Sequence, residues 1–222
     1  MAFISVFEVI GPNMVGPSSS HPAGAASIAR LVWKMMNEKI VSVHFTLYGS
    51  FARTYKGHGT DRALLGGMMG FRTDDERIRD SFEIAEKEGI EFSFTPNTVE
   101  TDTHPNTVDM VVTGESGRVF TARGESLGGG KVQLTRINGV KVVFTGEYDS
   151  LIVIHKDHPG VISNVTAVLS KHKANIAYLR VYRETKGGIA YMIIESDEKI
   201  TDVIVDEIGK NPFVKDTMLI RR

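Results

Sequence analysis

Apolar residues recur along the chain at two different spacings, and these spacings predict its helices and strands. In residues 20–38 apolar side chains recur every three or four positions, which predicts an amphipathic helix. Pro22 is compatible only with the first turn of that helix, so the helix should begin near Ser20 or His21. Residues 40–48 alternate apolar and polar side chains, which is typical of a strand with one buried face.

Two further helices are predicted before the chain turns to strands. A loop rich in glycine, histidine and lysine should follow the first strand and lead into a short helix at residues 61–69. Thr73 and Glu76 form a capping-box pattern for the next helix. Gly89 should end that helix, because glycine readily adopts the left-handed conformation found after a helix.

The rest of the chain predicts a run of short strands and then a second domain. A polar stretch near residues 146–150 suggests a boundary between a domain at residues 1–147 and another at residues 148–222. The second domain has the order βαββαβ, which is the ferredoxin-like arrangement. We therefore expect an α/β (α+β) protein in which a mixed α/β domain precedes a ferredoxin-like one. The first domain's remaining strands are expected at residues 92–94, 107–112, 119–122, 131–137 and 140–145, with Asn138-Gly139 as a hairpin turn between the last two.

Composition excludes several classes of function. The formal net charge is −1, so the chain lacks the basic excess that binds nucleic acid. No apolar run approaches the roughly 20 residues needed to span a membrane. Residues 1–11 carry no positive charge before their apolar residues, so we expect no signal peptide and a cytoplasmic protein. The cysteine count is zero, which excludes disulfides, thiol nucleophiles and the thiolate ligands that normally hold iron–sulfur clusters.

The densest group of reactive side chains lies directly before the first helix. Residues 16–24 read Gly-Pro-Ser-Ser-Ser-His-Pro-Ala-Gly and bring Ser18, Ser19, Ser20 and His21 to the helix start. Free backbone N–H groups and the helix dipole favour an anion at such a position, for example a carboxylate. Ser20 could equally serve as an ordinary helix cap, and the residues alone leave both interpretations open.

Three other polar segments are weaker signals when taken singly. Residues 55–61, Tyr-Lys-Gly-His-Gly-Thr-Asp, place His58 between glycines that allow a ligand to approach closely, although Thr60 or Asp61 could simply cap the next helix. His104-Pro105-Asn106-Thr107 is explained as well by a plain turn. The segment at residues 126–131, Ser-Leu-Gly-Gly-Gly-Lys, does not have the spacing of a phosphate-binding loop.

Together these segments resemble the iron–sulfur-dependent L-serine dehydratases. The order and spacing agree over the whole chain, and the last part resembles the ACT domain that ends the beta subunit in two-chain members of the family. One departure is Pro22, where the family usually has threonine, so residue 22 is left out of the predicted site. The matching segments are residues 16–21, 23–25, 48–52, 54–61, 104–107 and 126–131.

The resemblance implies a lyase that converts L-serine to pyruvate and ammonia with a [4Fe-4S] cluster, in which an open iron acts on the serine hydroxyl. Because this chain has no cysteine, the cluster would be held by a cysteine-containing alpha subunit. The resemblance assigns no metal ligand to this chain. The predicted catalytic residues are His21, His58, Asp61 and His104, and the predicted substrate-binding residues are Ser18, Ser19, Ser20, Lys56, Thr60 and Asn106.

In the predicted ACT domain, the turn between the first strand and the first helix resembles a ligand-binding loop. Its effector-binding residues would be Asp157, His158, Gly160 and Val161. An amino-acid effector, such as serine, and simple self-association through this domain are both open.

Two other functions fit the same residues. The chain could be a non-catalytic, serine-sensing allosteric module, for which the serine loop alone would be enough. It could also be a metallohydrolase with His21, His58, Asp61 and His104 as ligands, although no HExxH-type spacing is present.

Overall fold

The computed structural model describes residues 13–100 and 102–221, which form two compact units at residues 1–139 and 140–222. The expectation of no signal peptide concerns residues outside this description. The predicted domain boundary after residue 147 stays a prediction. Within the described parts of the chain, no helix is both long and apolar enough to cross a membrane.

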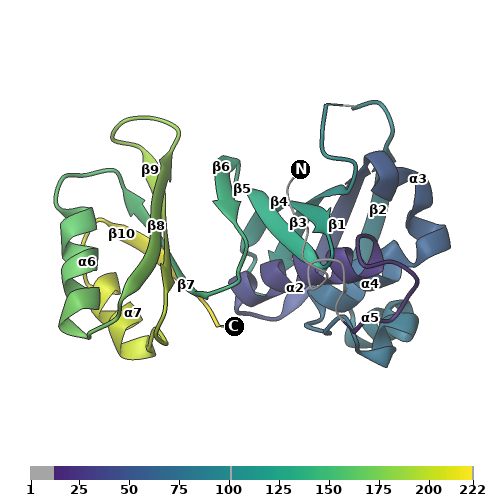
Figure 1. The fold of residues 1–222 in the computed structure, drawn as a ribbon, viewed down its shortest axis with the longest axis horizontal. Coiled ribbons are helices and arrows are strands. Elements are labelled where there is room, and N and C mark those ends of the chain that lie inside the picture. The colour runs from purple at the N-terminus through teal and green to yellow at the C-terminus, as the bar shows by residue number, and fades with distance from the viewer. Residues whose placement is uncertain (1–12, 101, 222) are drawn as a thin grey trace, which may run out of the picture. The chain divides into compact units, whose positions relative to one another are not determined.

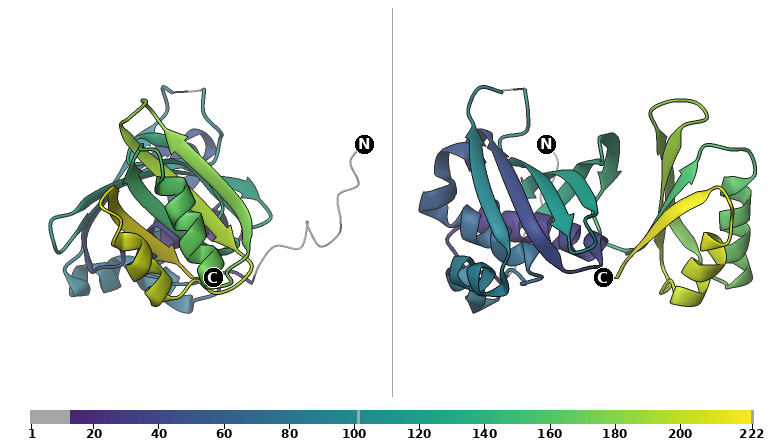
Figure 2. Two further views of the ribbon diagram at one scale, coloured as in Figure 1. Left: turned by 90° about the vertical axis from the view of Figure 1, so that its left-hand side faces the viewer. Right: turned by 180° about the vertical axis from the view of Figure 1, so that it is seen from behind.

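The first unit is built on a mixed sheet in which β1 (Ile40–Tyr48) occupies an interior position. β1 pairs in parallel with β2 (Glu91–Asn97) and antiparallel with β3 (Thr107–Gly114). The sheet order is β2-β1-β3-β4-β5-β6, and its helices pack along one face (Figures 1 and 2). The remaining strands of this sheet are β4 (Val119–Gly128) and β5 (Lys131–Ile137), followed by β6 (Val140–Phe144), which comes directly after the first unit in the sequence.

Most predicted strands and the first helix are confirmed. Asn138 and Gly139, with φ of 47° and 85°, form the predicted turn between β5 and β6. Helix α2 (Pro22–Met36) begins at the predicted proline and buries its apolar stripe, which includes Ile28, Val32 and Met36. The predicted short helix is α4 (Thr60–Met68).

The predicted loop after β1 is wrong, because residues 49–58 form helix α3 (Gly49–His58). The glycines of this segment suggested a loop, but Gly57 lies within the helix with open space around it. The helix ends at His58, one residue after that glycine, and Gly59 follows as its C-cap. There the backbone adopts a φ of 72° and the Gly59 N–H donates to the Tyr55 carbonyl.

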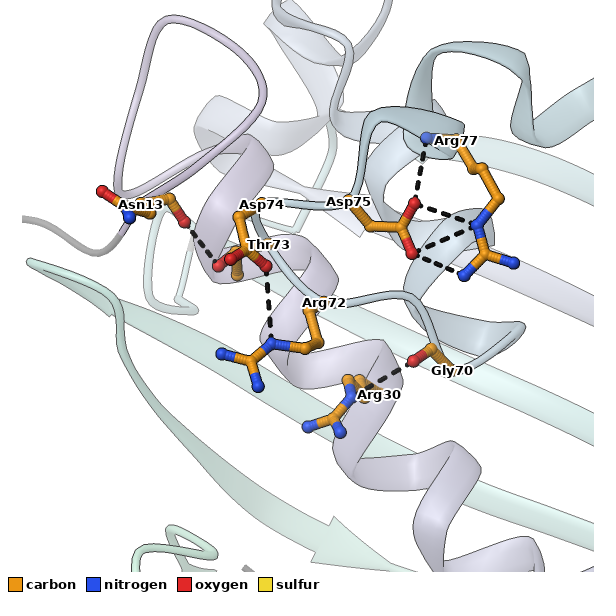
Figure 3. Close-up of polar contacts among 8 residues, drawn as sticks. All are labelled: Asn13, Arg30, Gly70, Arg72, Thr73, Asp74, Asp75 and Arg77. Atoms are coloured by element: carbon orange, nitrogen blue, oxygen red, sulfur yellow. Dashed lines mark hydrogen bonds and ion pairs between the residues drawn. The ribbon is translucent and has the colours of Figure 1, made fainter.

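The predicted capping box at Thr73 and Glu76 is also wrong. Figure 3 shows that the Thr73 hydroxyl donates to the Asn13 carbonyl instead, at 2.8 Å. The Asp75 carboxylate accepts the Arg77 N–H at 3.0 Å and caps a short 3₁₀ helix, η1 (Glu76–Asp80). Helix α5 (Ser81–Glu88) then follows and ends at Gly89, as predicted.

The second unit has the predicted ferredoxin-like topology. Its four strands pair antiparallel in the order β10-β7-β9-β8, and the two helices cover one face of the sheet (Figure 1). Apolar residues of β7 and β9, such as Leu151 and Met192, pack there against Val165 of the first helix. The elements are β7 (Asp149–Lys156), α6 (Val161–Lys171), β8 (Ile176–Arg183), β9 (Ile189–Ser196), α7 (Asp202–Gly209) and β10 (Val214–Ile220).

Candidate active site

His21 lies at the start of α2, and hydroxyl groups contact both of its ring nitrogens. Nε2 is 2.9 Å from the Ser50 Oγ, while Nδ1 is 3.2 Å from the Ser20 Oγ and 3.4 Å from the Ser18 Oγ. Ser50 comes from the first turn of α3, immediately after β1. The ring is therefore held between the serine loop and the start of another helix.

The serine side chains do not cap α2. His21 is the N-cap residue, and its side chain makes no capping hydrogen bond. The Ser18 and Ser20 hydroxyls instead lie 3.2 Å apart, and the Ser18 Oγ accepts the His21 N–H at 3.3 Å. This arrangement argues against the capping interpretation, because these serines hold His21. Ser19, between them, is half-buried.

His58 is the neighbour of His21. It is the last residue of α3, and the two rings meet edge to face with centroids 4.8 Å apart. The Nδ1 atom of His58 is buried without a hydrogen-bond partner among the described residues. Two predicted catalytic histidines, 37 positions apart by their numbers (58 − 21), are thus in contact.

The loop of His104 reaches the same place through its proline. The Pro105 carbonyl accepts the Ser50 N–H at 2.6 Å and the Phe51 N–H at 3.3 Å. Both N–H groups belong to the first turn of α3, where backbone N–H groups have no partner within the helix. Gly49 permits this approach, since its φ is 52° and an added Cβ would lie 2.7 Å from the Pro105 Cα and carbonyl oxygen. The His104 side chain itself closes a local turn, with its Nδ1 accepting the Asn106 N–H at 3.3 Å.

Ser126, near the end of β4, contacts both the segment at residues 104–107 and α2. Its N–H donates to the Asn106 carbonyl at 3.0 Å, and its side chain occupies the space where Gly24 of α2 would carry a Cβ. Ser126 is completely buried. The serine loop (residues 16–21) leads directly into α2. Helix α2 and the proline loop (residues 104–107) are therefore both in contact with the end of β4.

Unsatisfied polar atoms collect in these segments. Six buried side-chain nitrogen and oxygen atoms of the described residues have no hydrogen-bond partner, and four of them are His58 Nδ1, Thr60 Oγ1, Asn106 Oδ1 and Ser126 Oγ. Buried polar atoms in proteins are nearly always paired, so such a group requires an explanation. A polar ligand or water that these atoms bind would supply one.

Burial also perturbs the ionisable groups. It lowers the pKa of His21, and the positive charge of protonated His58 lowers it further. Burial raises the pKa of Asp61, while the Arg62 N–H, which donates to its carboxylate at 2.8 Å, opposes that rise. Among the described residues Asp61 makes no hydrogen bond to a histidine. Lys56 is exposed on α3, and its charge is a minor influence that lowers the Asp61 pKa.

In the second unit, the side chains of the predicted effector loop mostly contact residues of the same domain. The Asp157 carboxylate accepts hydrogen bonds from the Gly187 N–H and from Arg183, and these lower its pKa. The His158 ring stacks on Phe213 with centroids 3.9 Å apart. Gly160, with a φ of 93°, is the N-cap of α6, and Val161 is buried. An effector role for these four residues stays a prediction.

Sequence reasoning missed two residues of the site, Ser50 and Ser126. Ser50 follows Gly49, where the sequence predicted a loop after the first strand. A prediction of a helix that begins there would have drawn attention to the Ser50 hydroxyl in its first turn. Ser126 lies two residues before three glycines, in a segment that lacks the spacing of a phosphate-binding loop. Within the described residues no group of three or more His, Cys, Asp or Glu side chains is placed to hold a metal ion.

The fold and site define a class: an α/β domain with a serine–histidine cradle, followed by a ferredoxin-like domain of the ACT type. The profile of the AHAS small subunit-like ACT domain matches residues 151–215. The profile of the serine dehydratase beta chain matches residues 5–136. The chain belongs to the serine dehydratase beta chain family.

Individual relatives agree over nearly the full length. The chain is 42% identical over 214 residues to a probable L-serine dehydratase beta chain of Bacillus subtilis, which covers 96% of each chain. It is 40% identical over 208 residues to the L-serine dehydratase beta chain of Peptoniphilus asaccharolyticus, covering 94% of each. A D-3-phosphoglycerate dehydrogenase of Bacillus subtilis is 29% identical over 197 residues, which cover 88% of this chain and 37% of that protein.

Proposed function

We propose that this chain is the beta subunit of an iron–sulfur-dependent L-serine ammonia-lyase, which deaminates L-serine to pyruvate and ammonia with a cysteine-containing alpha subunit. The names of its two full-length relatives support the activity and the division into chains. The observation that carries the proposal is the contact between the serine–histidine cradle and His58, beside buried polar atoms without partners.

The residues of this chain do not fit the role of cluster ligands. The sequence contains no cysteine, and the described residues contain no cluster of three metal-ligating side chains. We therefore assign the [4Fe-4S] cluster entirely to the alpha subunit. The beta subunit then supplies side chains that contact the substrate and side chains that accept or donate protons.

The polar groups match the parts of L-serine. The hydroxyls of the serine loop and the start of α2 suit the substrate carboxylate, and the Asp61 carboxylate suits its ammonium group. His58, with an unpartnered ring nitrogen, is our candidate for the base that removes the α-proton. Loss of the β-hydroxyl then leaves aminoacrylate, which water converts to pyruvate and ammonia. Both nitrogens of His21 are occupied by hydroxyls, so His21 fits proton relay or support.

The test is reconstitution. The purified chain, its cysteine-containing partner and the two together are assayed anaerobically for pyruvate formed from L-serine. We expect activity only in the mixture. Full activity of this chain alone, or none in a mixture that contains an intact cluster, would refute the proposal.

One observation favours a second function, a serine-sensing allosteric module. The similarity to a D-3-phosphoglycerate dehydrogenase extends over 88% of this chain. A sensor needs only the anion cradle, whereas the contact between His21 and His58 favours proton transfer. A chain that binds L-serine but adds no activity to its partner would support the sensor.

A further inference from the structure

Ser50 joins segments that are far apart in the sequence. Its side-chain oxygen lies 2.9 Å from the Nε2 atom of His21, and its backbone N–H donates to the Pro105 carbonyl at 2.6 Å. Ser50 thereby links the serine loop to the proline loop. No other described residue hydrogen-bonds to both His21 and Pro105.

The backbone around Ser50 leaves it little freedom. It lies in the first turn of α3, directly after the buried end of β1. Its carbonyl accepts the Thr54 hydroxyl at 2.8 Å. Gly49, before it, is fixed against Pro105 in a left-handed conformation. The hydroxyl of Ser50 is consequently presented to His21 from a rigid position.

The contact with Ser50 is the shortest that the His21 ring makes. The opposite nitrogen, Nδ1, has only the contacts of 3.2 Å and 3.4 Å with two hydroxyls of its own loop. A serine hydroxyl can both donate and accept a hydrogen bond, so these contacts fit either tautomer of the ring and constrain its orientation. The partner on the restrained backbone, Ser50, rather than the local loop, is therefore the group that can set the orientation of His21.

We infer that Ser50 is a positioning residue, which fixes the orientation of the His21 ring and through it the geometry beside His58. The effect on catalysis rests on the proposed function, whereas the effect on the His21 ring does not. Removing the hydroxyl frees Nε2 and lets the ring turn away from His58. Partners that orient an active histidine in metal sites contribute about 10- to 100-fold to activity, and we expect a loss of turnover in that range here.

The chain contains a matched control for this experiment. Ser93 contacts His44 with its Oγ 2.8 Å from Nδ1, on neighbouring strands of the same sheet and outside the site. Ser93→Ala removes a serine–histidine contact of the same kind. Ser50→Ala and Ser50→Thr are compared with it, because threonine restores the hydroxyl.

The first measurement is steady-state kinetics of the assembled two-chain enzyme. We expect Ser50→Ala to lower kcat about 10- to 100-fold with KM nearly unchanged, since Ser50 acts through His21. Ser50→Thr should recover most of the activity, and Ser93→Ala should match the wild type. Wild-type kcat in Ser50→Ala, or an equal loss in Ser93→Ala, would overturn the positioning role.

The second measurement needs no activity. In the ¹⁵N-labelled chain, the ring-nitrogen signals of His21, assigned by their absence in His21→Gln, report the hydrogen bonding of its two ring nitrogens. We expect them to shift in Ser50→Ala, to return in Ser50→Thr and to stay in place in Ser93→Ala. Unchanged signals in a folded Ser50→Ala chain would overturn the inference. An inactive wild-type complex would refute only the proposed function, because these signals still test the link.

Discussion

Replacing Gly49 with alanine should separate the site's loops, and the structure allows the effect to be worked out. Gly49 connects β1 to α3 with a φ of 52°. An alanine Cβ would lie 2.7 Å from both the Pro105 Cα and the Pro105 carbonyl oxygen. These are backbone atoms, so they cannot rotate away as the end of a side chain does. The proline loop must move, and its hydrogen bond to the Ser50 N–H must lengthen.

Two costs add at this position. A left-handed conformation costs an L-residue about 1–2 kcal/mol, and crowding of a packed site costs about 1–3 kcal/mol. The sum is about 2–5 kcal/mol, a large part of the roughly 5–15 kcal/mol by which domains are stable. At about 2–4 °C per kcal/mol, the melting temperature should fall by about 4–20 °C.

The assay is thermal unfolding of Gly49→Ala beside Gly57→Ala. Gly57 lies in the same helix, outside the left-handed region, and an added Cβ there meets no atom within 4 Å. Alanine at residue 57 should therefore stabilise the helix by about 0.5–1 kcal/mol. If Gly49→Ala melts at or above the temperature of Gly57→Ala, the reasoning about the Pro105 contact is refuted.

Three other predictions concern ionisable residues. His58→Ala should lower pyruvate formation by the assembled enzyme about 100-fold or more, and near-normal turnover would remove His58 from proton transfer. Burial raises the pKa of Asp61, so its charge destabilises the fold above that pKa; Asp61→Asn should raise the melting temperature at pH 7 and lose this advantage below about pH 4. Burial lowers the pKa of His21, so wild-type stability should fall as pH drops through about 6.5. Denaturant unfolding at pH 7 and pH 5 should show a smaller decrease for His21→Gln, and equal decreases would contradict the burial of His21.

Helices and strands were predicted wherever a local pattern determined them. Pro22 placed the start of α2, and alternation gave β1 because one face of the sheet is buried. α3 was missed because Gly57 and Gly59 both suggested a loop, although only Gly59 needs the conformation that ends a helix. The capping box failed because the Thr73 hydroxyl found a partner far away in the sequence, at Asn13.

The order of strands could not be predicted. Strand order depends on which strands pair with one another. The alternation of apolar and polar residues in β1 is the same beside a parallel neighbour, such as β2, as beside an antiparallel one, such as β3. The site was foreseen in part for the same reason. His21 and His58 were expected through the resemblance, but their contact, and the hydroxyl of Ser50 beside them, arise from the fold.

The two histidines of the site differ in the partners of their ring nitrogens. Burial lowers the pKa of His21, and hydroxyls contact both of its ring nitrogens. His58 retains a buried nitrogen without a partner. The ring nitrogens of His21 therefore already have hydroxyl partners, whereas His58 has one nitrogen left for another polar group. The serine motif holds His21 against His58, and under the proposed function His58 is the ring that we expect to meet the substrate.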